Sequence, residues 1–234
     1  MQDRLQMNDR ILSCEKTERS SDGEEYTVEF ETAGPVRFGF DETMEYGLYD
    51  IGRELELDTL LSAVLEARMK RQIIPYCAFT RRTESQISAR LQDKFSAAGG
   101  YAGVWAPYVL PAAEKVVDYL IERGYAGDNA YCASYIKTCA NKNVSGNYIA
   151  AELIKRGVER NVAAAAVADA GLDEEAACRR ALEKKLDSVQ VIPDENGRVP
   201  QKTRASLIRF LLARGFETGM AVDMVDDYLG GARN

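Results

Sequence analysis

The sequence predicts a mostly α-helical protein, in which three tandem three-helix repeats form an elongated curved array behind a small antiparallel β meander. The main observation is a phrase that occurs twice, over residues 149–162 and 207–220: apolar residues at i and i+4, a basic residue, then a glycine. This pattern is typical of a helix that ends at a glycine C-cap. A fainter copy lies at 87–95. A repeat of roughly 45 to 60 residues predicts helical units that pack against their neighbours.

The repeats and a change of hydrophobic period divide the chain into four expected segments. The period is two in the first segment and 3.6 in the others. The segments are a β-rich extension over 1–57, a first repeat over 58–126 with an insertion at 97–111, a second repeat over 127–171 and a third over 172–234.

Residues 11–40 predict an antiparallel meander of three strands. Tyr26, Val28 and Phe30 alternate with polar residues, and turn-forming residues stand before and after the run. Because three strands are marginal alone, we expect the meander to pack on the first helices. A packing role is favoured over an activity of its own. The residues expected to join this packing are Phe38, Phe40, Tyr46 and Leu48.

Two helices are expected next. The first begins near Asp58, turns an apolar face inward and ends near residues 75–79. The second is introduced by Thr83 and Gln86, which have the spacing of a capping box.

The insertion at 97–111 breaks the repeat with glycines, prolines and Trp105, the only tryptophan. We interpret Trp105 and its neighbours as a lid over a gap in the core. The alternative is an aromatic loop that stacks on a partner.

Helix signals resume over 112–123 and stop at a glycine. Asp128 begins the next helix, and Asp173 with two glutamates opens the third repeat, where negative charge suits the positive end of the helix dipole. A polar connector over 193–200 precedes the second copy of the phrase. The last helix is expected to bury Val222, Val225, Tyr228 and Leu229.

The composition excludes several classes of function. The chain has no histidine, and its five cysteines are scattered, so we expect free thiols, no metal site and no cofactor. No phosphate-binding or hydrolase motif occurs, so we expect no enzyme and no catalytic residues. No run of about 18 apolar residues and no signal-peptide core occurs, which favours a cytoplasmic protein without membrane contact.

The net charge of −7 hides an asymmetry. Residues 1–58 carry 16 acidic and 6 basic residues, a net charge of −10, whereas residues 59–234 carry 21 acidic and 24 basic residues, a net charge of +3. The most basic window, 68–94, holds seven basic and two acidic residues. A basic face on the helical part is therefore compatible with the acidic total.

The strongest site candidate is the basic residue before the helix-ending glycine or its equivalent, because Lys94, Arg156 and Arg214 would then occupy one place in three copies. Capping alone could explain each, since a cation in the last turn stabilises a helix by about 0.3 to 1 kcal/mol. Neighbouring cations are not needed as caps. The candidate partner-binding residues are Arg81, Arg82, Arg90, Lys94, Lys155, Arg156, Arg209 and Arg214.

Three motifs, in order, resemble the RecX family of bacterial regulators of the RecA recombinase. Residues 82–91, R-T-E-S-Q-I-S-A-R-L, resemble its signature R-S-E-x-E-L-x-x-K-L. Residues 124–133, G-Y-A-G-D-N-A-Y-C-A, are similar to G-Y-L-D-D-E-x-Y-A, and residues 152–158 to E-L-x-x-K-G-I. The resemblance spans about 60–229. Departures from the signatures occur at Gln86, Ile87 and Gly127 and in the insertion.

The resemblance implies a non-enzymatic regulator that lies in the groove of a RecA filament on single-stranded DNA. There it would inhibit ATP hydrolysis, strand exchange and co-protease activity, and so act in homologous recombination, DNA repair and the SOS response. We expect a monomer with the RecA filament as partner. The alternative is a single-stranded-DNA-binding helical module, motivated by the basic window and Trp105, whose binding would weaken steeply with salt.

Overall fold

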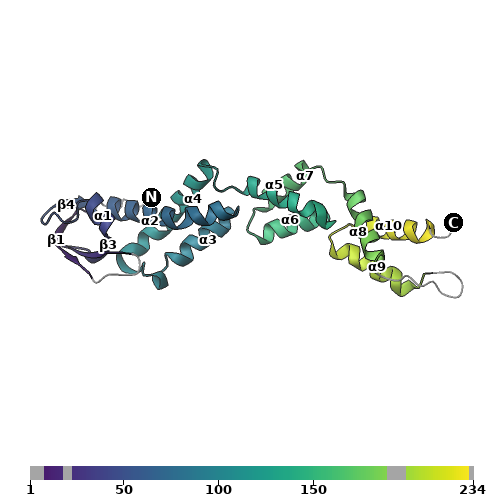
Figure 1. The fold of residues 1–234 in the computed structure, drawn as a ribbon, viewed down its shortest axis with the longest axis horizontal. Helices are drawn as coiled ribbons and strands as arrows, with labels where there is room; N and C mark the ends of the chain where they lie inside the picture. The colour runs from purple at the N-terminus through teal and green to yellow at the C-terminus, as the bar shows by residue number, and fades with distance from the viewer. Residues whose placement is uncertain (1–7, 18–22, 189–198, 232–234) are drawn as a thin grey trace. The chain divides into compact units, whose positions relative to one another are not determined.

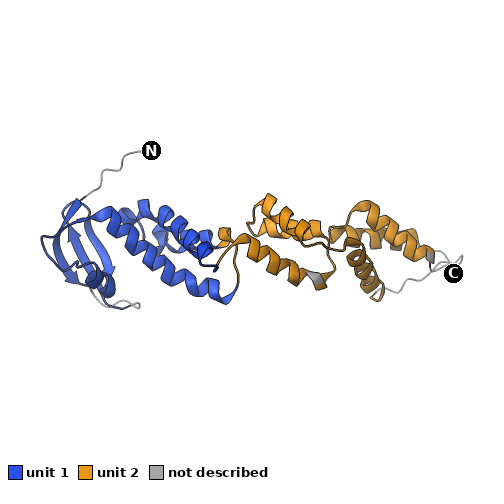
Figure 2. Cartoon of the chain, turned by 90° about the horizontal axis from the view of Figure 1, so that it is seen from above, with its two compact units in different colours: residues 1–80, 87–125 blue, residues 81–86, 126–234 orange. Residues whose placement is uncertain are grey.

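The computed structural model describes residues 8–17, 23–188 and 199–231. The predicted class is confirmed: antiparallel strands at the start are followed by a largely helical chain (Figure 1). The chain forms two compact units, drawn in blue and orange in Figure 2. The first unit comprises residues 1–80 and 87–125, and the second comprises residues 81–86 and 126–234.

The strands form one antiparallel sheet in the order β3-β2-β1-β4. The expected meander corresponds to the first three strands, but the prediction missed β4, which is too short to show an alternation and pairs back with β1. Ile11 pairs with Phe30 across β1 and β2, and both are buried. The strands are β1 (Asn8–Lys16), β2 (Glu25–Phe30), β3 (Gly34–Gly39) and β4 (Glu54–Glu56).

The helices of the first repeat follow the predicted 3.6-residue period. The long helix α2 buries its apolar face, and Phe38 and Leu48 are buried as expected. Phe40 also packs on the meander, since its ring lies 6.2 Å from that of Tyr26, although its side chain is 44% exposed. The helices are α1 (Phe40–Glu45), α2 (Leu57–Phe79), α3 (Glu84–Lys94) and α4 (Ala106–Glu122).

The insertion packs inward. Its two short 3-10 turns, Ala97–Gly99 and Gly103–Trp105, bring the Trp105 ring edge-on to Phe38 at a centroid distance of 5.8 Å. Trp105 is only 6% exposed, so the expected lid is found and its ring is not free to stack on a partner. The predicted start of the next helix at residue 112 is wrong. Residues 106–111 already belong to α4, whose first turn accepts a proline because its N–H groups have no helical partner.

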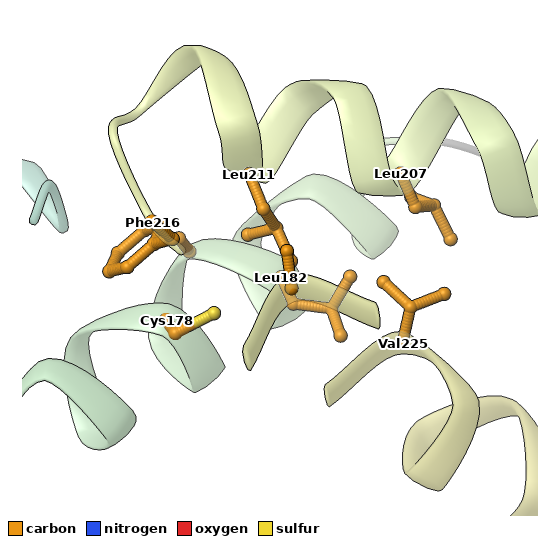
Figure 3. Packing of buried hydrophobic residues seen from close by; sticks show 8 residues of the cluster. Cys178, Leu182, Leu207, Leu211, Phe216 and Val225 are labelled. Atoms are coloured by element: carbon orange, nitrogen blue, oxygen red, sulfur yellow. The ribbon is translucent and has the colours of Figure 1, made fainter. Parts of the chain in front are cut away.

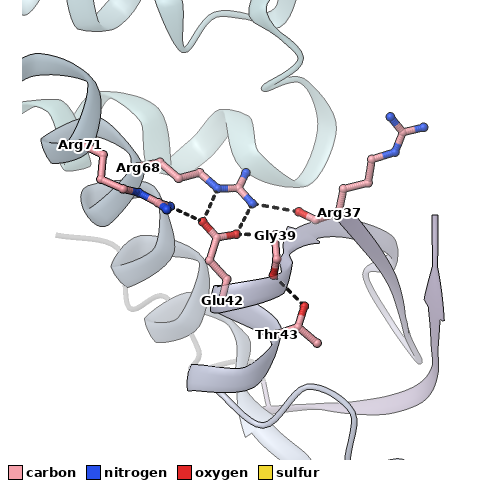
Figure 4. Close-up of polar contacts among 6 residues, drawn as sticks. All are labelled: Arg37, Gly39, Glu42, Thr43, Arg68 and Arg71. Carbon is pink, nitrogen blue, oxygen red and sulfur yellow. Dashed lines mark hydrogen bonds and ion pairs between the residues drawn. The ribbon is translucent and has the colours of Figure 1, made fainter. Parts of the chain in front are cut away.

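A buried carboxylate fastens the sheet to α2. Glu42 is 5% exposed and accepts hydrogen bonds from Arg68, from Arg71 at 2.8 Å and from the Gly39 backbone N–H at 2.9 Å (Figure 4). Arg68 also lies over the Trp105 ring at 4.8 Å. Burial by itself would raise the pKa of Glu42, but the hydrogen bonds and charge of Arg68, with Gly39 and Arg71, lower it.

The second unit contains two further sets of three α-helices, each around its own apolar cluster. Figure 3 shows the cluster of the third repeat, where Leu182, Leu207 and Leu211 pack with Phe216. A 3-10 turn, Ala140–Lys142, follows the first of these helices. The α-helices are α5 (Asp128–Cys139), α6 (Gly146–Lys155), α7 (Arg160–Asp169), α8 (Glu174–Leu186), α9 (Gln201–Ala213) and α10 (Thr218–Gly231).

The last helix differs in part from its prediction. Val225 is fully buried, but Tyr228 is 46% exposed, so its expected burial is wrong. Most of the expected connector, residues 193–198, lies outside the described residues. The further subdivision of the chain at residues 57, 126 and 171 stays a prediction.

Several absences hold for the described residues. In that part of the chain no helix is long and apolar enough to cross a membrane. No group of cysteine, aspartate and glutamate side chains there could hold a metal ion. No disulfide links the five cysteines there, and four of them, all but Cys14, are buried.

Candidate partner-binding surface

Two of the candidate arginines lie inside the second unit at joints, the places where the end of one helix is hydrogen-bonded to the residue that precedes another helix. Arg156 ends α6, and its backbone oxygen accepts a hydrogen bond from the Thr83 hydroxyl at 2.8 Å. Its guanidinium donates to the backbone oxygen and to the carboxylate of Glu152, both at 2.7 Å, and lies 4.6 Å from the centre of the Tyr135 ring. The Arg156 side chain is 32% exposed. Arg156 therefore holds the end of α6 with most of its side chain covered.

The end of α9 repeats this arrangement at Arg214. Its backbone oxygen accepts a hydrogen bond from the Ser145 N–H at 3.1 Å. Its guanidinium donates to the backbone oxygens of Lys142 at 2.7 Å and Asn143 at 3.2 Å, and lies 4.6 Å from the centre of the Phe210 ring. In both joints, the residue that precedes a helix, Thr83 before α3 or Ser145 before α6, therefore donates a hydrogen bond to the arginine that ends another helix, α6 or α9.

The hydroxyl residues at these joints also cap their own helices. The Gln86 N–H donates to the Thr83 hydroxyl at 3.1 Å and the Thr83 N–H donates to the Gln86 side chain at 3.3 Å, which confirms the predicted capping box. Ser145 caps α6 by accepting from the Tyr148 N–H at 3.1 Å. Thr83 therefore both starts its helix and binds the end of another.

The glycines of the repeated phrase are required at the same joints. Gly157 and Gly215 have φ angles of +87° and +83°, in the left-handed region that favours glycine. A Cβ atom at Gly157 would lie 2.5 Å from the Cβ of Ser85, and one at Gly215 would lie 2.5 Å from the Ser145 hydroxyl oxygen. The predicted glycine C-caps are confirmed, since the next N–H in each copy bonds back to the helix.

Carboxylates reinforce both joints. The Glu84 N–H donates to the Asp128 carboxylate at 3.0 Å, and the Asp128 N–H donates back to Glu84 at 3.3 Å. The Gly146 N–H donates to the carboxylate of Glu174 at 2.5 Å. Free N–H groups at helix starts are thus satisfied by side chains from the start of a neighbouring helix.

Lys94 does not share the place of the two joint arginines. Phe95 rather than a glycine follows it, and the Phe95 N–H continues the helical pattern by donating to the Leu91 backbone oxygen at 2.9 Å. Its ammonium donates to the Gln72 side chain at 2.5 Å. The predicted equivalence of the three cations therefore holds for Arg156 and Arg214 and is wrong for Lys94.

The remaining candidates present more charge to solvent. In the first unit Arg90 is exposed, with its guanidinium 5.4 Å from the centre of the Tyr76 ring. In the second unit Lys155 is exposed and donates to Glu152 at 2.9 Å, a hydrogen bond that raises the pKa of Lys155. The exposed candidates are Arg81, Arg90, Lys94, Lys155 and Arg209, whereas Arg82, Arg156 and Arg214 are half-buried.

The chemistry of these cations suits them to bind anionic groups. Charged nitrogen donors of arginine and lysine recognise carboxylates and phosphates. Sequence reasoning missed the joint role of Thr83 and Ser145. The only available signal was that a hydroxyl residue stands at the corresponding place in two repeats.

Comparison with known proteins gives sequence relatives named regulatory protein RecX. No family model matches the chain. Regulatory protein RecX of Yersinia pseudotuberculosis serotype O:1b is 28% identical over 103 residues, which are 44% of this chain and 53% of that protein. The chain thus spans about half the length of this relative. Regulatory protein RecX of Mycobacterium sp. (strain JLS) is 28% identical over 177 residues, 72% of this chain and 87% of that protein.

Two solved structures share the fold. A crystal structure of regulatory protein RecX aligns with a TM-score of 0.59 and 16% identity, over 94% of this chain and 99% of that one. The crystal structure of RecX from Lactobacillus salivarius aligns with a TM-score of 0.54 and 18% identity, over 72% of this chain and 98% of that one. The chain is thus similar in sequence to proteins named regulatory protein RecX and similar in fold to two RecX crystal structures.

Proposed function

We propose that this protein is a non-enzymatic regulator that binds filaments of the RecA recombinase and inhibits their ATPase, strand exchange and co-protease activities. The observation that carries the proposal is the shared name of its relatives, regulatory protein RecX, because the resemblance to that family implies RecA as the partner. The helical repeats support it, since a tandem array offers an extended surface to a filament.

The exposed cations are the proposed contacts. Arg81, Arg90, Lys94, Lys155 and Arg209 would meet acidic groups of the filament or DNA phosphates, where complementary charge favours association. The half-buried candidates Arg156 and Arg214 would act indirectly, by holding the helices that carry the exposed residues.

The direct test is single-stranded-DNA-dependent ATP hydrolysis by the cognate RecA, titrated with this protein at constant DNA and moderate salt. We expect inhibition at well below one molecule per recombinase protomer, as action on a filament requires. Absence of inhibition at any ratio would contradict the proposed function.

Two charge-reversal pairs test the contacts. Arg90→Glu with Lys94→Glu, and Lys155→Glu with Arg209→Glu, should each raise the half-inhibitory concentration roughly tenfold or more, since two attractive contacts become repulsive. The control pair, Lys137→Glu with Lys202→Glu, changes the net charge equally at two other exposed lysines. If the control weakens inhibition as much, net charge matters and the assigned contacts are wrong.

Single-stranded-DNA binding remains the second candidate function, supported by the exposed Arg90 and Lys94 within the basic window. The two features that motivated it, the basic window as a whole and Trp105, support it less in the structure. Arg68 and Arg71 are engaged with Glu42, and Trp105 is buried. Direct binding would show a log–log salt slope of roughly 0.7 per phosphate neutralised. Weak binding to bare single strands even at low salt would exclude this route and favour action on the recombinase itself.

A further inference from the structure

The third repeat carries a groove that the cationic surface does not explain. It lies between α8 and α10 and encloses about 870 Å³. Its floor includes Leu182, which is 1% exposed, and the half-buried Met220 and Met224, with Tyr228 at 46% exposure beside them. Aliphatic, thioether and aromatic groups thus form an apolar strip that is partly open to solvent.

The strip follows one face of α10. Met220, Met224 and Tyr228 stand at i, i+4 and i+8, so successive turns place them one above another. Asp223 and Asp227 run beside them with the same spacing, and both are exposed. One helix face therefore combines an apolar row with a parallel row of carboxylates.

The facing side of α8 adds the opposite edge. Glu175 and Glu183 are exposed there, and Arg179, the one cation in the lining, donates to Glu175 at 3.0 Å. The lining therefore holds four carboxylates and one guanidinium, a formal charge of −3. An apolar floor between two acidic edges is complementary to a helix with an apolar face and basic flanks.

We propose that this acidic groove, between α8 and α10, binds an amphipathic helix of a protein partner whose apolar side chains are flanked by lysine or arginine. Leucine-type anchors at i, i+4 and i+7 would lie along Met220 and Met224, whose unbranched thioethers adapt to different apolar shapes. Lysines or arginines one turn apart would meet the carboxylates, which are themselves one turn apart. The groove is thus a second interaction surface, of opposite charge to the proposed filament contacts.

Methionine methyl NMR of the full chain gives a local readout. The probe is a synthetic amphipathic helix of leucine and lysine, with a peptide of the same leucine spacing but glutamate for lysine as the control. We expect the Met220 and Met224 signals to shift and saturate, while exposed Met44 and buried Met69 stay unchanged. Equal shifts at Met44, or equal binding of the glutamate peptide, would overturn the proposal.

A pair of variants tests the charge. Asp223→Asn with Asp227→Asn should weaken binding of the lysine peptide about 3- to 10-fold, because two contacts at the groove edge are lost. Glu114→Gln with Asp118→Asn is the matched control, since these exposed carboxylates have the same spacing on α4. Equal weakening by both pairs would overturn the assignment. So would Met220 and Met224 shifts that depend on protein concentration without peptide, because a second copy would then be the occupant.

Discussion

Replacing Gly215 with alanine tests whether the repeated phrase encodes a joint between helices. Gly215 follows the end of α9 with a φ angle of +83°, where an L side chain costs about 1 to 2 kcal/mol. The new Cβ would also lie 2.5 Å from the Ser145 hydroxyl oxygen and 2.8 Å from the Tyr148 backbone nitrogen. Something must therefore move at the start of α6.

The cost can be worked from these two effects. The hydroxyl and the nitrogen are the two partners of the α6 N-cap hydrogen bond, and loss of such a cap costs about 0.5 to 2 kcal/mol. Together with the backbone strain, Gly215→Ala should lower the free energy of unfolding by about 2 to 4 kcal/mol. Urea denaturation followed by circular dichroism measures this, with the midpoint shifted and the slope unchanged.

Two controls in the same unit separate strain from close contact. Gly171 has a φ angle of +57° with nothing within 4 Å of an added Cβ, so Gly171→Ala should show backbone strain alone. Gly219 lies in α10 without a positive φ and without near neighbours, so Gly219→Ala should be neutral or slightly stabilising. If Gly215→Ala costs no more than Gly171→Ala, the close approach of α9 and α6 is refuted.

Three further outcomes follow from the structure. Glu42→Gln should lower the free energy of unfolding by about 2 kcal/mol or more, because the mostly buried Arg68 guanidinium loses its carboxylate partner. Since the folded-state pKa of Glu42 is lowered, its stabilisation should be complete above the unfolded-state pKa of about 4.3 and be lost as pH falls through the folded-state value. Denaturation measured over a pH series that shows constant stability in this range would contradict this role. In native protein at pH 8 a thiol reagent should modify Cys14 first, because Cys178 is fully buried and burial raises its pKa to about 11; rapid modification of Cys178 would count against the third-repeat core. Trp105, as the only tryptophan, should emit at shorter wavelength than the unfolded chain and resist iodide quenching, and solvent-like emission would contradict its packing in the insertion.

Much of the fold was predictable because its signals are local. Apolar spacing in α6 and α9, the capping box at Thr83 and the C-cap glycines each depend on residues within about two turns. The missed strand β4 shows the limit, since its three residues carry no readable period and are defined only by pairing with β1.

The candidate site was predictable only as a list of cations. A sequence shows that a basic residue precedes a glycine, but either capping or partner binding fits that pattern. The structure separates the candidates by exposure: Arg156 and Arg214 are engaged at joints, whereas Arg90 and Lys94 face solvent.

The sequence by itself determined the class, the helical repeats and the glycine ends of α6 and α9, because helix periodicity and capping depend on near neighbours. Only the tertiary structure decided what the joint residues touch. The hydroxyl of Thr83 meets the carbonyl of Arg156 across 73 positions in the chain, and the Arg214 guanidinium reaches Lys142 across 72. Such contacts depend on how helices pack against one another, and no local pattern of residues records that packing.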